Sequence, residues 1–286
     1  MIDDLDVRCP IPDRGAAPIL PVPVEGVQAP RPRIGIFSLT SCEGCSLTIL
    51  EQEDELLSLL GAIDIVDFRE AKSGADGEVD IAFVDGAVSS PHDVARVRQI
   101  RKNARILVAI GACACLGGVN TLKHAQSEHD YRQFVYGDRA PQFPTGDARP
   151  LSAVVRVDYE LPGCPMVGAE FLRFVRCVLS GRPFRLPNDA VCVECKRRGT
   201  LCLYEKGETC LGPVTRGGCA AICPAYGARC EGCRGLLGNE QLRIFARNCL
   251  QLHGTPLAEI LDRLRLFGVF QGETLPDSQP PDGPPT

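Results

Sequence analysis

The sequence CVECKRRGTLCLYEKGETCLGPVTRGGCAAICPAYGARCEGC, residues 192–233, holds eight of the sixteen cysteines in this chain of 286 residues. They are Cys192, Cys195, Cys202, Cys210, Cys219, Cys223, Cys230 and Cys233. Four thiolates hold one cubane iron–sulfur cluster or one structural zinc ion, so the run predicts two such sites. The segment has few long apolar runs, and its fold is therefore expected to depend on the groups that its cysteines bind.

The eight cysteines can be divided between two sites in two ways. Sequential filling groups Cys192, Cys195, Cys202 and Cys210, and then Cys219, Cys223, Cys230 and Cys233. Interleaved pairing, as in bacterial two-cluster ferredoxins, is the alternative. The spacing also allows zinc ribbons in place of iron–sulfur clusters. The chain has only four histidines, which are scattered, so we expect them to be solvated or core side chains rather than ligands.

A second group of cysteines lies upstream, each close to the end of an apolar, strand-like run. Cys42 and Cys45 form a CxxC pair in TSCEGCSLT, Cys113 lies in GACACLGG, and Cys164 lies in LPGCPM. The carboxyl ends of parallel strands meet at one edge of a sheet, where open α/β sheets hold their ligands. These four cysteines therefore predict a third site. Cys115 is the alternative to Cys113, which is favoured because it comes directly after the strand.

The first part of the chain alternates between strand-like and helix-like patterns. Strands are expected over residues 34–40, 63–68, 79–88, 105–113 and 154–160, and helices over 46–61, 91–103, near 124–136, and over 167–180. Strands that alternate with helices predict an α/β domain in which a mostly parallel sheet is covered on both faces.

The composition divides the chain into four parts. Residues 1–32 are an arm rich in proline, 33–182 are the α/β part, 183–270 are cysteine-rich, and 271–286 are a polar tail that is expected to be flexible. Further helices are expected over 240–250 and 255–268. Cys9 is expected to be a free thiol, whereas Cys177 and Cys249 lie in apolar, helical stretches and are expected to pack in the core.

Charge and composition exclude several classes of protein. The 44% hydrophobic content is typical of a globular protein, and the net charge of −5 argues against nucleic acid as a partner. No apolar stretch reaches the ~18 residues of a membrane span. The first residues, MIDDLDVRCP, lack the order of a secretory signal, so we expect a cytoplasmic protein with reduced cysteines. No nucleotide-binding motif or hydrolytic triad is found, which favours electron transfer.

Together, TSCEGCSLTIL, GACACLGGV, LPGCPM and the eight-cysteine run resemble the small, electron-transfer subunit of NiFe hydrogenases. The resemblance covers roughly residues 33–270. It is greatest to the delta subunits of soluble, cytoplasmic sulfhydrogenases and NAD(P)-linked NiFe hydrogenases. The first part alone also resembles the cluster-bearing subunit of respiratory complex I, which lacks the eight-cysteine extension.

The resemblance implies a flavodoxin-like parallel sheet domain followed by a small cysteine-rich iron–sulfur domain, with three 4Fe–4S clusters and no catalytic residue. The proximal cluster would lie on Cys42, Cys45, Cys113 and Cys164. The medial cluster would lie on Cys219, Cys223, Cys230 and Cys233, and the distal cluster on Cys192, Cys195, Cys202 and Cys210. Cys192 replaces a histidine that many respiratory relatives use, and Cys223 adds a fourth ligand where those relatives have a three-cysteine, 3Fe–4S site.

The resemblance also implies partners. Hydrogen would be split, reversibly, at a NiFe centre in a separate large subunit, whose paired-cysteine motifs this chain lacks. Electrons would pass to iron–sulfur and flavin subunits of the diaphorase type, so FAD and NAD(P) are expected only in those partners. Two alternatives remain: a complex-I-like, quinone-linked electron-transfer subunit, and a structural zinc-binding scaffold protein.

Overall fold

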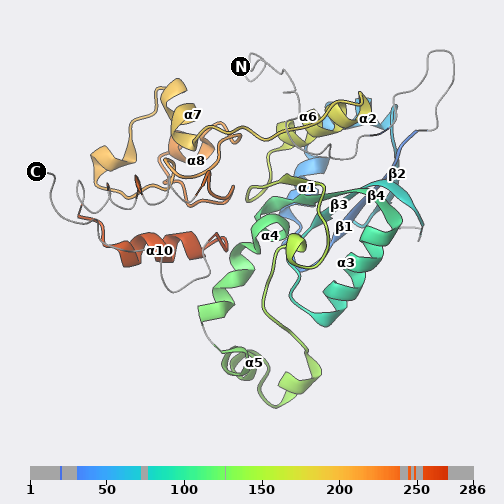
Figure 1. The fold of residues 1–286 in the computed structure, drawn as a ribbon, viewed down its shortest axis with the longest axis horizontal. Helices are drawn as coiled ribbons and strands as arrows, with labels where there is room; N and C mark the ends of the chain where they lie inside the picture. The colour runs from blue at the N-terminus through green and yellow to red at the C-terminus, as the bar shows by residue number, and fades with distance from the viewer. Residues whose placement is uncertain are drawn as a thin grey trace, which may run out of the picture.

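A five-stranded parallel sheet forms the centre of the computed structural model, which describes residues 20, 31–71, 77–125, 127–238, 244–245, 248 and 254–269 (Figure 1). The strands are β1 (Arg33–Ser38), β2 (Asp64–Phe68), β3 (Val79–Asp85), β4 (Ala104–Ile110) and β5 (Tyr159–Leu161). Their order is β2-β1-β3-β4-β5, a doubly wound order whose switch point lies between β1 and β3. The prediction of an α/β fold with a parallel sheet is confirmed.

Helices cover both faces of this sheet. On one face, α1 (Gly44–Leu50) and α6 (Gly168–Leu179) pack on β3 residues such as Phe83. On the other face, α3 (Pro91–Asn103) packs on the alternate residues of β3, such as Val84. Burial on both faces explains why the strands read as continuous apolar runs.

Aromatic side chains connect α6 to the sheet. The Phe174 ring lies 5.7 Å from Phe83, 5.1 Å from Tyr159 and 5.3 Å from Phe184, each in an edge-to-face arrangement. Such pairs contribute about 0.5–1.5 kcal/mol each beyond the burial of their surface. Phe184 belongs to the segment that leaves α6, so this cluster also holds the start of the cysteine-rich region against the sheet.

Three predicted elements differ from the structure. The helix expected over 46–61 is interrupted between α1 and α2 (Glu53–Leu60), where the Gln52 side chain lies against Gly168 of α6. The last strand is shorter than expected, because a 3-10 turn, η3 (Leu151–Ala153), and an irregular segment precede β5. The strand expected over 105–113 ends at Ile110, and α4 (Gly111–Leu116) begins there. Contacts between distant segments decide these boundaries, and local patterns do not contain them.

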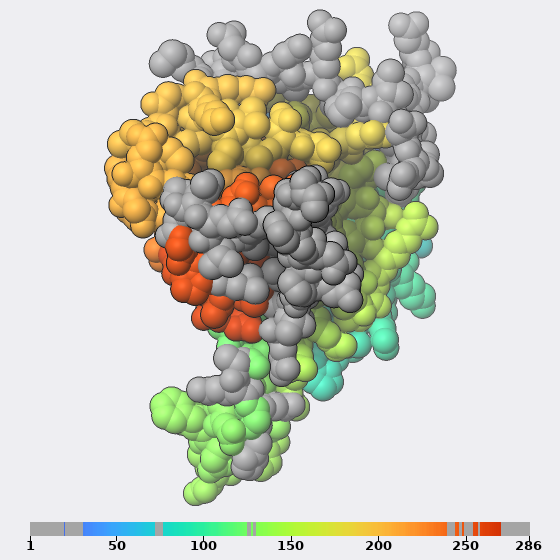
Figure 2. All heavy atoms as spheres, turned by 60° about the vertical axis from the view of Figure 1, so that its left-hand side comes forward, coloured from blue at the N-terminus to red at the C-terminus, as the bar shows by residue number. Residues whose placement is uncertain are grey.

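The segment after α4 projects from the rest of the molecule, as the green lobe of Figure 2 shows. It contains η1 (Gly118–Ala125), α5 (Glu128–Tyr136) and η2 (Gly137–Gln142). The helix expected near 124–136 corresponds to α5. Phe134 on α5 is 91% exposed.

The cysteine-rich region consists of short elements joined by turns. These are α7 (Val191–Arg197), η4 (Leu203–Lys206) and α8 (Ile222–Ala225), and Figure 1 shows them grouped with α10 (Leu257–Arg265) on one side of the sheet. The helix expected over 255–268 corresponds to α10. The predictions for the N-terminal arm, Cys9, Cys249 and the tail lie outside the described residues, as does most of the helix expected over 240–250. None of the helices in the described part has the length and apolarity to span a membrane.

Candidate metal centres

The four upstream cysteines lie at the carboxyl edge of the sheet. Cys42 follows β1, Cys45 is on α1, Cys113 is on α4 after β4, and Cys164 follows β5. Their thiols are near enough to raise one another's pKa: Cys113 is affected by both Cys42 and Cys164. Cys45 is affected by Cys113 and Cys164. The structure therefore brings together the four residues that the sequence grouped.

Two glycines allow the backbone to approach these sulfurs. Gly111 has a φ of +80°, and a Cβ there would lie 2.4 Å from Sγ of Cys45. Gly118 has a φ of +64°, and a Cβ there would lie 2.6 Å from Sγ of Cys113. Any side chain at either position would be strained and would displace a sulfur. The space around this set of thiols is therefore shaped by glycine at two places.

Burial is the main influence on the thiols of this set. It raises the pKa of Cys113 to about 12, with Asp85 as the next cause, and raises the pKa of Cys45 well above its usual value. The backbone N–H groups of Val119 and Met166 oppose these rises because they stabilise the thiolates. The Asn120 side chain also donates to Sγ of Cys113, at 3.6 Å. Metal coordination would therefore release protons here, while existing donors stabilise the bound sulfurs.

Cys113 and Cys115 lie on the same helix but in different surroundings. Cys115 is 6% exposed, packs in the apolar core and lies 3.5 Å from the carbonyl oxygen of Ala109, to which its thiol donates. Cys113 instead faces Cys42 and Cys164. Cys113 lies on α4 rather than directly after the strand, as the sequence suggested, but the geometry still favours it over Cys115.

Asp85 is a residue near this set that the sequence analysis missed. It ends β3, is 1% exposed, and its Oδ2 has no hydrogen-bond partner among the described residues. Burial, and then the charge of Glu43, raise its pKa to about 6. Its position at the end of a buried strand, in the sequence VDG, was the available signal.

A second set of thiols forms around α7. The pKa of Cys192 is raised to about 12, first by burial and then by Cys210, Cys195 and Cys202. A Cβ on Gly212 would lie 3.1 Å from Sγ of Cys192 and 3.5 Å from Sγ of Cys210, so both sulfurs border the same point. The structure brings these four cysteines together, which favours sequential filling over interleaved pairing.

The remaining cysteines lie between the first two sets. Burial is the main cause that raises the pKa of Cys233 to about 11, and Cys219 and Cys223 contribute to the rise. The backbone N–H of Cys164, from the first set, faces the Cys233 thiol and opposes this rise. Cys230 is close to Cys233, and its backbone N–H donates to Sγ of Cys210 at 3.2 Å. This third set therefore has contacts with both of the others.

The donors in each set fit a 4Fe–4S cluster, which takes four cysteine thiolates and is tuned by hydrogen bonds to sulfur. All twelve predicted ligands are cysteines, and N–H groups face several of their sulfurs. In the part of the chain that the structure describes, no three cysteine, histidine or carboxylate side chains are grouped closely enough to hold a single metal ion.

Comparison with known proteins agrees with this geometry. Residues 42–178 match the family of the NADH ubiquinone oxidoreductase 20 kDa subunit. The delta subunit of sulfhydrogenase 2 from Pyrococcus furiosus is 38% identical over 205 residues, which are 71% of this chain and 86% of that protein. One of the subunits of the F420-non-reducing hydrogenase vhu from Methanocaldococcus jannaschii is 30% identical over 86% of this chain and 96% of that protein. The chain belongs to this family of hydrogenase subunits.

A solved structure supports the same assignment for the first part of this hydrogenase subunit. A chain of an NAD+-reducing [NiFe]-hydrogenase in the H2-reduced state is 31% identical, with a TM-score of 0.51, over 55% of this chain and 96% of that one. The resemblance found in the sequence is thus confirmed. The protein is an electron-transfer subunit of a hydrogenase, an oxidoreductase, and is related to NAD-reducing enzymes.

Proposed function

We propose that this chain is the small subunit of a NiFe hydrogenase and relays electrons between a hydrogen-splitting large subunit and an NAD(P)-linked flavin subunit. The observation that carries the proposal is the arrangement of twelve cysteines in three neighbouring sets of four. The third set has contacts with each of the others, through Cys164 on one side and Cys210 on the other. Such an arrangement is what a row of electron carriers requires.

Each set would hold one 4Fe–4S cluster. The proximal ligands would be Cys42, Cys45, Cys113 and Cys164; the medial ligands Cys219, Cys223, Cys230 and Cys233; and the distal ligands Cys192, Cys195, Cys202 and Cys210. When bound, these clusters would supply one-electron carriers, which are needed because hydrogen delivers two electrons at once. The proximal set is proposed as the entry because it belongs to the segment shared with the NAD+-reducing enzyme.

The protein's own contribution is to fix the positions of the thiolates and to control their environment. Gly111 and Gly118 keep the backbone close to the proximal sulfurs, and Asn120 donates to one of them. Burial of Cys230 and Cys233 keeps water away from the medial set. These are the means by which proteins set the potential of an iron–sulfur cluster.

The proposal extends to the organisation and partners of the chain. Residues 33–182 would form a flavodoxin-like domain with the proximal site, and residues 183–270 a second domain with the other two. The NiFe centre would belong to the large subunit, and FAD and NAD(P) to diaphorase-type subunits. A cytoplasmic location is proposed, since NAD(P) is a cytoplasmic reductant and the cysteines must remain reduced.

Metal analysis of the full chain, purified anaerobically, tests this proposal. About twelve iron and about twelve sulfide per chain, without nickel, are expected from three 4Fe–4S clusters. A large subunit containing nickel should co-purify. About three zinc per chain without sulfide would instead identify a structural zinc protein and overturn the proposal.

A quinone-linked, complex-I-like subunit is the second candidate, favoured by the match of residues 42–178 to the 20 kDa subunit family. That match ends before the eight-cysteine run, whereas the F420-non-reducing hydrogenase relative covers 86% of the chain. Reduction of a quinone, but not of NAD(P), by the purified complex would favour this candidate over the proposed one.

A further inference from the structure

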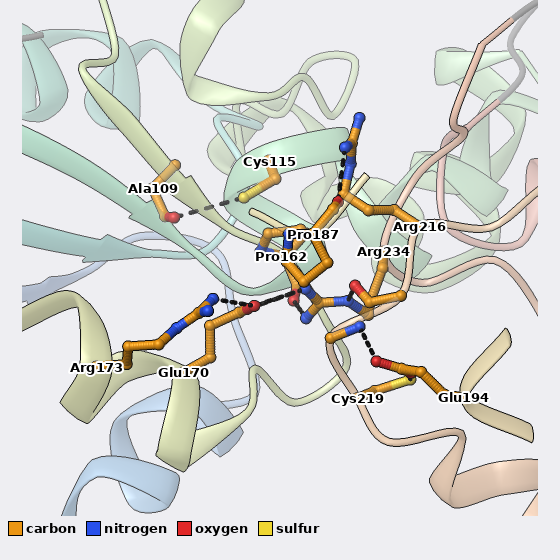
Figure 3. A network of polar contacts seen from close by, with 12 residues as sticks. Ala109, Cys115, Pro162, Glu170, Arg173, Pro187, Glu194, Arg216, Cys219 and Arg234 are labelled. Atoms are coloured by element: carbon orange, nitrogen blue, oxygen red, sulfur yellow. Dashed lines mark hydrogen bonds and ion pairs between the residues drawn. The ribbon is translucent and has the colours of Figure 1, made fainter. Parts of the chain in front are cut away.

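Arg234 is buried where the cysteine-rich region meets the sheet, and Figure 3 shows the contacts of its guanidinium group. Its side chain has an exposed fraction of 0%. Nη2 lies 3.0 Å from both carboxylate oxygens of Glu170 on α6. Nη1 donates to the carbonyl oxygen of Pro162 at 2.6 Å, and Nε to that of Gly217 at 2.8 Å. All three nitrogens therefore have partners.

These partners belong to different cysteine motifs. Arg234 follows Cys233 directly, Pro162 comes two residues before Cys164, and Gly217 two residues before Cys219. One side chain thus joins the proximal segment to two segments of the medial set. Gly218 completes the arrangement, because a Cβ there would lie 2.4 Å from Nη2 of Arg234.

An ion pair of this kind is costly unless it has a function. Removing an arginine and a carboxylate from water costs several kcal/mol per ion, and apolar pairs of similar size are often at least as stable. The side chain of Glu170 is 4% exposed. Burial raises the pKa of Glu170, and the Arg234 guanidinium opposes that rise. The pair is therefore an expensive way to hold two segments together by packing alone.

The charge of Arg234 acts on the medial thiols. It favours the thiolate forms of Cys219 and Cys233, and so lowers their pKa relative to what burial alone would produce. A positive charge in a buried, poorly solvated place acts over several ångströms. The same charge would stabilise the more negative, reduced state of any redox group on these sulfurs.

We propose that Arg234 is a positioning residue that joins the proximal and medial cysteine motifs and raises the reduction potential of the medial group. This inference rests on the proposed function, since it requires a cluster on the medial cysteines. Glu170 orients Arg234 and partly neutralises it. The pair would thereby set how readily the medial site accepts an electron from the proximal one.

Glu194 provides an opposing charge on the same set. It belongs to the CVEC motif of the distal set, and its carboxylate accepts hydrogen bonds from the backbone N–H groups of Gly218, at 2.6 Å, and Ala221, at 3.2 Å. Its Oε2 lies 3.9 Å from Sγ of Cys219, and its charge raises the pKa of that thiol. Removing this charge should therefore shift the medial potential in the direction opposite to removing Arg234.

Redox titration monitored by electron paramagnetic resonance tests the inference. The full chain, with the subunits that co-purify, is prepared anaerobically as wild type and as Arg234→Gln, Glu170→Gln and Glu194→Gln. The medial signal is the one that disappears in Cys219→Ser. Arg156→Gln is the matched control, because Arg156 precedes β5 at the opposite edge of the sheet and its side chain is 80% exposed.

Arg234→Gln is expected to lower the midpoint potential of the medial signal, whereas Glu170→Gln and Glu194→Gln are expected to raise it. Arg156→Gln should leave it unchanged. If Arg234→Gln loses iron and sulfide, Glu170→Gln and Arg234→Lys decide, and the lysine variant should retain a potential near that of the wild type. A role confined to packing would shift Arg234→Gln and Glu170→Gln in the same direction or not at all, and either result would overturn the inference.

The wild-type sample separates this inference from the proposed function. Iron, sulfide and a medial signal in wild type, together with unmoved potentials in the variants, would overturn only the role of Arg234. Wild-type protein with zinc and no sulfide would overturn both.

Discussion

At the scale of single residues, the two thiols of α4 are predicted to behave differently. Cys113→Ser should remove the proximal site, with a loss of about four of about twelve iron atoms per chain, because one of four ligands is missing. Cys115→Ser should retain the iron and lower the free energy of unfolding by about 1 kcal/mol, since a buried thiol with a carbonyl partner becomes a hydroxyl. Iron analysis and hydrogen oxidation by the complex measure both effects. Equal losses in the two variants would refute the choice of Cys113.

Gly111 gives a second prediction at this scale. Gly111→Ala should displace Sγ of Cys45 and reduce the iron content by about a third, because its Cβ would lie 2.4 Å from that sulfur. Gly227→Ala is the matched control: Gly227 has the same φ of +80°, but a Cβ there would meet nothing within 4 Å. The control separates backbone strain, which both variants share, from the steric effect on the sulfur. Equal iron contents in the two variants would contradict the prediction.

At the scale of elements, the docking of α6 is predicted to depend on one aromatic side chain. Phe174→Ala should lower the free energy of unfolding by about 3–5 kcal/mol, because it leaves a cavity among three aromatic rings in a fully buried place. Phe134→Ala, at a position that is 91% exposed, should change it by less than about 0.5 kcal/mol. Denaturant unfolding of the full chain measures both. A similar effect of the two substitutions would show that α6 does not depend on this cluster.

At the scale of the whole molecule, the two parts of the chain should respond differently to loss of metal. The sheet is stabilised by large apolar clusters on both faces. Cysteines make up much of one small cluster in the cysteine-rich region, which includes Cys210 and Cys230. Removing iron with a chelator should therefore greatly increase hydrogen exchange over residues 190–233, while β1, β3 and β4 remain protected. Mass spectrometry of peptides from each part measures this, and uniform loss of protection would contradict it.

The sequence by itself determined the α/β class, the parallel sheet and the cysteine motifs, because these depend on local periodicity and on residue spacing. Helix α3 begins and ends where its pattern predicts, since the Ser90 side chain caps it locally. The break between α1 and α2, the early end of β4, and the surroundings of Cys115 were decided only by the tertiary structure. So were the burial of Asp85, the Glu194 carboxylate beside Cys219, and the pairing of Arg234 with Glu170. The physical reason is that each of these depends on contacts between segments far apart in the chain, and desolvation and charge interactions follow from position in space rather than from sequence spacing.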